Sequence, residues 1–547
     1  MINYDDISGK TSTVTSGNSE FSNKTLSIFR EKLNYLNSKR FQKLLSSVLE
    51  IEKKLNNNYL DIEFGVNNKM DVFIFQVRRI SKIYELDNLK LKRFKKELPI
   101  LEKKIKKIKL PQKKIYGQIN VLGQMPDWNP AEIIGRTPKP FAFSLYRELI
   151  TKKTWAKARE IMGYRKLKKT ELMFSLSGHP YIDTRLSFNS FIPESLPNKI
   201  GQSLVNCWLN KLTKNPNDHD KVEFNIATTT YNFNFDKQVK RLTDNLLSKK
   251  ELKIFKEFHK KQFLNYFITS SKSSIEYCLK QIDELKRRQN EYTKKTSLKK
   301  VINDCKNFGI IPFSILARHA FISKSILVSL SEIKIIKTTD IDKILDSIST
   351  VASEFLEDIK KVKQKKISKK LFNLKYGHLR PGTYDITSKR YDETNYFNLK
   401  DFKLSKKIIL KEKNLISEKT IQKIENLIKK EKLKNLNYKI LIDYIKNSIS
   451  LREHAKFIFT KNVSLIIQKI EKRCKKINYN MEDVSFLSLN EFTKSDYLNN
   501  LKLKNKINKN KEKFSIFKMI RMPQIISDKS AAYISPYQTN SPNFVTK

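Results

Sequence analysis

Two long amphipathic stretches most constrain the fold of this chain. Residues 237–370 mostly show the apolar spacing of helices that bury one face, and the pattern returns from residue 405 to about residue 476. Residues 24–57 also follow helical spacing, and residues 86–109 form a lysine-rich helical segment. Together these stretches predict a protein of the α+β class in which helices predominate.

Short strands interrupt the helical pattern. β-branched and aromatic residues alternate with polar ones on either side of turn residues, which predicts two hairpins and one further strand. We therefore expect small antiparallel sheets. The predicted strands are residues 59–64 and 72–77 around a turn at 67–69, residues 172–176 and 181–188 around a turn at 177–180, and residues 222–235.

Three segments have neither pattern. Residues 117–140 and 371–398 are rich in Gly and Pro relative to the rest of the chain, which predicts irregular loops. Residues 515–547 are expected to be short and extended. No internal repeat of fixed period is present.

Lysine dominates the charge of the chain. It has 109 basic and 56 acidic residues and a formal net charge of +53, which would attract nucleic acid, acidic membranes or phosphorylated ligands. The excess is spread along helical stretches, and arginine, which suits bidentate phosphate contacts, is sparse. We expect most of these lysines to reflect AT-rich codon usage, which also makes Gly and Pro scarce; a nucleic-acid surface is the less favoured alternative.

The cellular location and the role of the cysteines are predicted from the lack of a membrane helix, a signal peptide and a CxxC pair in the sequence. The longest apolar runs fall short of the ~18 residues of a membrane helix, and residues 1–23 are polar, unlike a signal peptide. The four cysteines form no CxxC pair. We expect a cytoplasmic protein with no membrane partner and no zinc module.

The first hairpin carries the side chains most suggestive of chemistry. Glu63 lies on one predicted strand, and Gln76 and Arg78 lie on its neighbour. A carboxylate can hold Mg²⁺ and an arginine can bind phosphate oxygens. Many hairpins carry such residues on a solvent-exposed face, so spacing alone leaves both interpretations open.

The motifs of this hairpin resemble a known family. Asp-Ile-Glu-Phe at residues 61–64, followed by Phe-Gln-Val-Arg-Arg at residues 75–79, is similar to the closing hairpin of the ATP-grasp domain in the phosphoenolpyruvate synthase and pyruvate phosphate dikinase family. The resemblance implies that Glu63 binds the Mg²⁺ of ATP and that Gln76 and Arg78 line the phosphate site. The proline that often follows the arginine in the family is replaced here by a second arginine.

Further segments resemble the same family in the same order along the chain. The resemblance implies a C-terminal part of an ATP-grasp domain at residues 1–85, a helical connector at 86–116, a central domain at 117–400, a helical region at 401–514 and a lead-in to a phosphohistidine domain at 515–547. The segments that carry it are Asn3–Asp6, Val14–Gly17, Asp127–Gly135, Ser144–Ile150, Gly178–Asp183, Tyr376–Ile386, Arg452–Phe457 and Pro542–Thr546.

The resemblance implies an activity that this chain would share with other proteins. Members of the family transfer phosphate from Mg²⁺-ATP to a histidine on a mobile domain and then to an acceptor. The Ser-His phosphohistidine signature is not found in the 547 residues. We therefore expect a split or truncated chain that works with a separately encoded N-terminal ATP-grasp part, a phosphohistidine domain and a small-molecule acceptor, and that is inactive alone. The alternatives are a non-catalytic scaffold and a basic nucleic-acid-binding protein.

Several polar residues outside the hairpin have two interpretations. Asp127, Asn129 and Glu132 either cap a helix that starts at Pro130 or line a cleft beside the nucleotide. His378 either takes part in proton or phosphoryl transfer or holds an irregular loop together. The structural role is the favoured expectation in each case.

Overall fold

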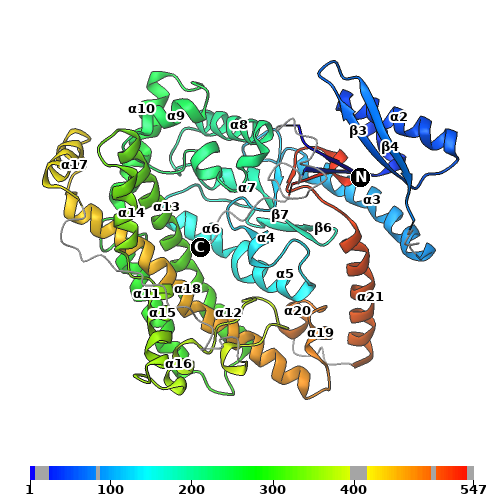
Figure 1. The fold of residues 1–547 in the computed structure, drawn as a ribbon. Coiled ribbons are helices and arrows are strands. Elements are labelled where there is room, and N and C mark those ends of the chain that lie inside the picture. The colour runs from blue at the N-terminus through cyan, green and yellow to red at the C-terminus, as the bar shows by residue number, and fades with distance from the viewer. Residues whose placement is uncertain (7–23, 82–86, 395–415, 494–499, 539–547) are drawn as a thin grey trace. The chain divides into compact units, whose positions relative to one another are not determined.

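The computed structural model describes residues 1–6, 24–81, 87–394, 416–493 and 500–538 (Figure 1). Helices predominate and the strands form small antiparallel sheets, which confirms the predicted α+β class. The chain forms two compact units. Unit 1 comprises residues 1–110, 176–179 and 512–547, and unit 2 comprises residues 111–175 and 180–511.

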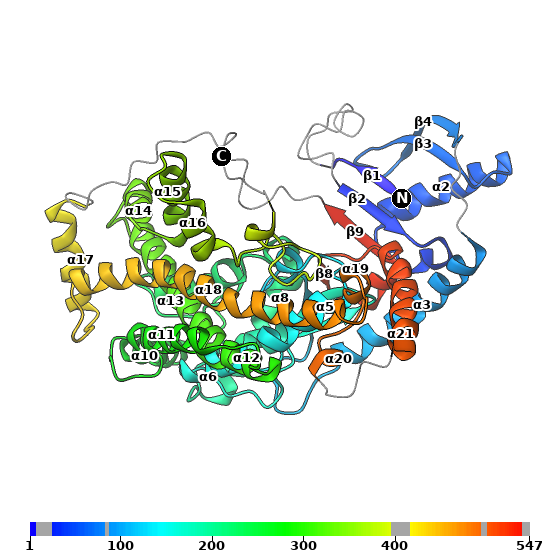
Figure 2. The ribbon, with the colours of Figure 1, turned by 90° about the horizontal axis from the view of Figure 1, so that it is seen from below.

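Unit 1 contains a three-stranded antiparallel sheet in the order β1-β2-β9 (Figure 2). The helix predicted from residue 24 is wrong at its start, because residues 24–28 form the central strand of this sheet. Its partner β9 lies more than 500 residues further along the chain, so no local pattern reports the pairing. The strands are β1 (Ile2–Tyr4), β2 (Lys24–Ile28) and β9 (Ile534–Gln538).

The predicted first hairpin is confirmed as β3 (Leu60–Val66) and β4 (Val72–Arg79). Helix α2 (Lys39–Leu55) packs its apolar side against the hairpin and the three-stranded sheet. Leu44 of α2 is buried in this core, and Phe64 of β3 packs against the same cluster. The predicted helix at residues 86–109 is confirmed as α3 (Asn88–Lys109).

Unit 2 is organised by two long helices, α13 (Ile311–Glu332) and α18 (Tyr438–Lys475), which pack along each other. Helix α11 (Ile275–Glu291) lies against both, and Figure 2 shows α18 as one continuous helix. Among the described residues, the helical stretch Leu298–Glu332 is long and apolar enough to cross a membrane, and 67% of its most apolar window is buried inside the protein. A buried core helix has the same properties.

A π-helical turn at Cys305–Ile310 leads into α13. Pro312 follows it and has no N–H to donate to the preceding turn, so the helix continues only with a local change of hydrogen bonding. Gly309 lies in this turn, where an added Cβ would meet Phe459 Cβ at 2.7 Å and Leu285 Cδ2 at 2.9 Å. The absence of a side chain at Gly309 therefore lets Phe459 of α18 and Leu285 of α11 pack against this turn.

We expect Gly309→Ala to lower the free energy of unfolding of unit 2 by about 1–3 kcal/mol, because the new methyl group overpacks this contact. The measurement is urea denaturation followed by tryptophan fluorescence. Gly382→Ala is the control, since its Cβ would come no closer than 3.1 Å to Asp385 Cβ. Equal losses in the two variants would contradict the packing argument.

The second predicted hairpin is correct in position but too long. Strand β6 (Met173–Leu176) pairs with β7 (His179–Asp183), and β7 also pairs with β5 (Leu122–Gly123). Residues 184–188 are not strand, because the Asp183 side chain accepts a hydrogen bond from the N–H of Leu186 and starts helix α7 (Thr184–Asn189).

The strand predicted at residues 222–235 is wrong. Residues 222–226 form a π-helical turn and residue 235 begins helix α9 (Phe235–Leu242). Residues 226–233 are instead all buried, and side-chain hydrogen bonds hold the irregular backbone within this stretch, such as that from Tyr164 Oη to Thr229 O at 2.8 Å.

The predicted irregular loop at residues 371–398 starts later than expected, because helix α16 extends from Lys369 to Tyr376. The predicted extended stretch at residues 515–547 likewise begins with the end of helix α21 (Asn500–Met519). The N-terminal segment at Val14–Gly17 and the segment Pro542–Thr546, which carry part of the family resemblance, lie outside the described residues.

Candidate functional site

The register of β3 and β4 brings the predicted nucleotide-site residues together. Glu63 lies directly opposite Gln76, and Asp61 lies opposite Arg78. Because side chains alternate between the faces of a strand, these four side chains share one face of the hairpin. All four are exposed, whereas the residues between Asp61 and Glu63 and between Gln76 and Arg78 are half-buried.

Arg78 is the cation of this face. Its guanidinium donates a hydrogen bond to the side-chain oxygen of Gln76, and its Nη2 lies 3.9 Å from Glu63 Oε1. The side chains of Arg78 and Glu63 are 60% and 51% exposed, so solvent screens their attraction to below about 1 kcal/mol. A ligand phosphate could displace Glu63 from Arg78 at little cost.

A β-bulge interrupts the hairpin next to these residues. Glu63 pairs with Gln76 and Phe64 pairs with Ile74, so Phe75 has no partner residue of its own. The Phe75 ring lies over Gly65, where an added Cβ would meet Cζ at 2.8 Å, yet the side chain is 67% exposed. Bulges commonly redirect side chains next to binding sites; this one places an aromatic ring beside the polar face.

Two carboxylates, Asp61 and Glu63, could approach a cation on this face. In the described parts of the chain, no group of three or more His, Cys, Asp or Glu side chains is placed to hold a metal ion. Mg²⁺ bound by one or two carboxylates takes its other ligands from water and from substrate phosphates. The donor set therefore fits Mg²⁺ that arrives with a nucleotide.

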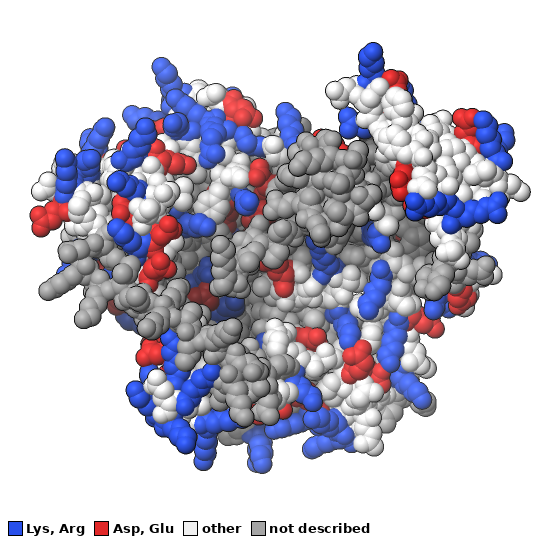
Figure 3. All heavy atoms as spheres, in the orientation of Figure 1, with Lys and Arg blue, Asp and Glu red and all other residues white. Residues whose placement is uncertain are grey.

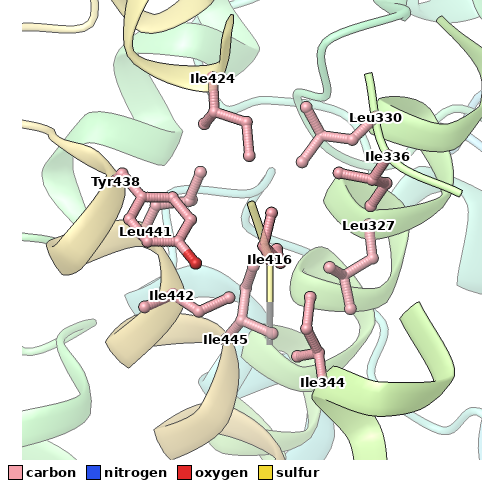
Figure 4. Close-up of a pocket in the computed structure, with 10 residues that line it drawn as sticks. All are labelled: Leu327, Leu330, Ile336, Ile344, Ile416, Ile424, Tyr438, Leu441, Ile442 and Ile445. Carbon is pink, nitrogen blue, oxygen red and sulfur yellow. The ribbon is translucent and has the colours of Figure 1, made fainter. Parts of the chain in front are cut away.

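A small apolar cavity in unit 2 offers no chemistry. It measures about 10 Å³ and is lined by aliphatic side chains from several helices and by Tyr438 (Figure 4). A cavity that is apolar and no larger than one water molecule stays empty. It is a packing gap in the core.

Sequence reasoning missed a buried cluster of four charged residues in unit 2. Arg159 Nη2 donates to Asp127 Oδ1 at 2.9 Å, and Arg318 donates to Glu223. Their side chains are at most 9% exposed. Both guanidinium groups also lie over the ring of Phe191, at 4.2 Å for Arg159 and 5.1 Å for Arg318.

Polar neighbours provide further hydrogen bonds to this cluster. Asp127 Oδ2 accepts from Ser187 Oγ at 2.8 Å. Arg318 Nη2 donates to Tyr164 Oη at 3.1 Å and to Thr229 Oγ1 at 3.1 Å. Among the described residues, Arg159 Nη1 and Arg318 Nε have no hydrogen-bond partner. The cluster ties together four separate segments of unit 2.

Burial shifts the pKa values of the charged groups in this cluster. It raises the pKa of Asp127 despite the opposing charge of Arg159, and it lowers the pKa of Arg159 despite Asp127. Burial would also lower the pKa of Arg318, but the Glu223 carboxylate and the Tyr164 hydroxyl outweigh it and raise that pKa. Because these charges are sealed from solvent, the cluster is suited to holding the fold together and not to binding a ligand.

The other polar residues singled out in the sequence have structural roles. Asn129 caps helix α4 (Pro130–Ile133) by accepting from the N–H of Glu132, as predicted. His378 is buried, its Nε2 lies 3.2 Å from Phe457 O, and burial lowers its pKa to about 3. The neutral imidazole of His378 thus connects the loop that contains it to Phe457 of α18.

Comparisons of the sequence with models of protein families and with curated proteins find no match. The case for a functional site therefore depends on the residues of the hairpin face and their geometry.

Proposed function

We propose that this chain is a component of an ATP-dependent phosphotransferase resembling the phosphoenolpyruvate synthase family. The exposed face of β3 and β4 forms one wall of a Mg²⁺-ATP site. The phosphoryl group passes to a histidine outside these 547 residues and then to a small-molecule acceptor. The N-terminal ATP-grasp part and the phosphohistidine domain are supplied by partner chains.

One observation carries this proposal: Glu63, Gln76 and Arg78 lie on the same exposed face, in adjacent positions of an antiparallel pair. In the proposed site Glu63 holds Mg²⁺, Arg78 contacts phosphate oxygens and Gln76 orients Arg78. Phosphoryl transfer depends mainly on positioning and charge stabilisation. The face of β3 and β4 would supply only part of the positioning and part of the charge stabilisation. We therefore expect the chain to be inactive alone.

We expect Glu63→Gln and Arg78→Gln each to weaken Mg²⁺-ATP binding by about tenfold, because each removes one charged contact to the metal or the phosphates. The measurement is isothermal titration calorimetry of the full chain, alone and with candidate partner chains added. Binding is expected to be much stronger in the mixture.

Two substitutions provide matched controls. Arg79→Gln removes the same charge one residue further along β4, where the strand alternation points the side chain to the other face. Glu50→Gln removes an exposed carboxylate of α2 that pairs only with Lys54 within 4 Å among the described residues. If all four variants bind Mg²⁺-ATP like the unaltered chain, the hairpin is not part of a nucleotide site and the scaffold alternative takes its place.

A further inference from the structure

A larger cavity in unit 2 plays no part in the proposed nucleotide site. It measures about 360 Å³, within the range of about 300–1,000 Å³ typical of small-ligand pockets. Its walls come from α9, from α10 (Lys249–Asn265) and from the end of α17 (Glu418–Lys430) with the turn that follows it. The cavity therefore lies within one unit, between the consecutive helices α9 and α10 and the turn after α17, which is distant from them in sequence.

The floor of the cavity is held by an internal ion pair network. Lys256 Nζ lies 3.2 Å from Asp236 Oδ2 and 3.2 Å from Glu431 Oε2. Tyr231 Oη donates to the same Glu431 oxygen at 3.0 Å. Burial would lower the pKa of Lys256, but Glu431 and Asp236 outweigh it and raise that pKa. Lys256 thus stays charged and joins α9, α10 and the turn after α17.

The remaining charge of the cavity is strongly positive. Of the twelve described residues that line the cavity, seven are lysines and three are acidic. Apart from Lys256, none of these lysines has a carboxylate within 4 Å among the described residues, and Glu257 is the one acidic lining residue outside the network. The lysines without such a partner are Lys240, Lys249, Lys253, Lys260, Lys430 and Lys432.

Six ammonium groups around one concavity repel one another unless an anion lies between them. A cleft lined by charge of one sign also focuses the electric field and raises the local concentration of counter-ions. Lys and Arg side chains occur in several separate regions of the face shown in Figure 3, so charge alone does not single out a site. The concavity and its fixed floor distinguish these six lysines from the others.

The lining indicates the kind of anion. None of the described residues that line the cavity is an arginine or an aromatic residue. Lysine binds phosphate as a point charge, without the fixed planar geometry of arginine. A nucleic-acid strand is usually bound along an extended groove with aromatic side chains on which bases stack. The cavity instead fits a compact ligand whose surface is mostly phosphate.

We propose that this cavity binds a small anion carrying several phosphate groups, of the class of linear or cyclic polyphosphates, through the six lysines above. The bound anion would connect α9, α10 and the turn after α17. This site is separate from the hairpin face, and the proposal does not rest on the phosphotransferase function.

The test uses tripolyphosphate and the full chain, with isothermal titration calorimetry at low and moderate salt. We expect saturable binding that weakens as salt rises. The triple variant Lys253→Gln/Lys260→Gln/Lys430→Gln is expected to weaken it by about 30-fold, because three charged contacts are lost. Glu257→Gln is expected to strengthen it about two- to fivefold, since it removes a repelling carboxylate.

The control is Lys237→Gln/Lys250→Gln/Lys261→Gln, which makes the same charge change with exposed lysines of α9 and α10 that do not line the cavity. It is expected to change the affinity less than about threefold. Equal losses in the two triple variants would overturn the proposal, because binding would then follow net charge. A single-stranded RNA that displaces tripolyphosphate and binds more tightly per phosphate would also overturn it.

Discussion

Arg318→Met is expected to lower the free energy of unfolding of unit 2 by about 3–5 kcal/mol, because it leaves the Glu223 carboxylate buried without its partner. Arg318 is 3% exposed and Glu223 is 9% exposed, so water cannot replace the lost contact. The substitution also removes donors to Tyr164 and Thr229. Urea denaturation followed by tryptophan fluorescence measures the effect, since all three tryptophans lie in unit 2.

Two further variants distinguish the effect of breaking the buried Arg318–Glu223 pair from the effect of removing an arginine elsewhere. Arg287→Met removes an arginine of α11 that is 58% exposed and paired with Glu284 and Glu291; we expect a loss below about 1 kcal/mol. The double variant Arg318→Met/Glu223→Gln is expected to be more stable than Arg318→Met alone, because no buried charge is left unpaired. A double variant as unstable as the single one would contradict this account.

His259→Leu is expected to raise the free energy of unfolding at neutral pH by about 1–2 kcal/mol, because it removes two buried polar atoms that lack partners. His259 is 1% exposed, and neither ring nitrogen has a hydrogen-bond partner among the described residues. The rings of Phe255 and Phe235 lie 4.6 Å and 5.7 Å from the imidazole. A leucine of similar volume suits these surroundings better than a polar ring.

The same substitution is expected to reduce the sensitivity of unit 2 to acid. Burial lowers the pKa of His259 to about 3 and that of His319 to about 4, whereas an unfolded histidine has a pKa of about 6.5. As the pH falls from about 6.5 to 4, only the unfolded chain takes up these protons, so stability is present above this window and is lost through it. Each histidine accounts for a loss of up to about 3 kcal/mol.

Unfolding free energies measured from neutral pH down to about pH 4 check this linkage. In His259→Leu, the contribution of His259 disappears and that of His319 remains. His454→Leu, at a half-buried position of α18, is the control and is expected to change the pH dependence less. An unchanged acid profile in His259→Leu would show that the imidazole is protonated in the folded state.

Helices and strands that are determined by their local sequence were predicted correctly. The β3–β4 hairpin follows from strand alternation around Asn67, and helix α3 follows from helical spacing up to Lys109. The register of this hairpin then makes it necessary that Glu63, Gln76 and Arg78 share a face. The strand alternation therefore predicts that these side chains lie together, whereas their assignment to a nucleotide site came from the family resemblance and stays a prediction.

Segments whose conformation depends on contacts with residues far away in the sequence were not predicted. Residues 24–28 have a helical pattern, yet they become β2 because β9 pairs with them. Residues 222–235 alternate like a strand, yet they begin with a π-helical turn, and the backbone of Thr229 accepts a hydrogen bond from Tyr164 of another segment. In both cases tertiary contacts outweigh local propensity.

The charged residues illustrate the same division. Arg318 and His319 interrupt an otherwise apolar stretch of α13, which is the one sequence signal that a buried charge needs a partner. Nothing in the sequence identifies Glu223 as that partner. Lys253 and Lys260 likewise resemble every other lysine of the chain until the fold places α9, α10 and the turn after α17 around the same concavity.

Periodicity and turn residues act over a few positions, so the sequence alone predicts that helices predominate, where the first hairpin lies and which side chains its exposed face presents. The folded chain is needed to reveal the order of the β1-β2-β9 sheet, the pairing of Arg318 with Glu223 and the grouping of six lysines around one concavity. These features depend on distances between residues up to several hundred positions apart. Such distances are set by packing of the whole unit, and no local pattern contains them.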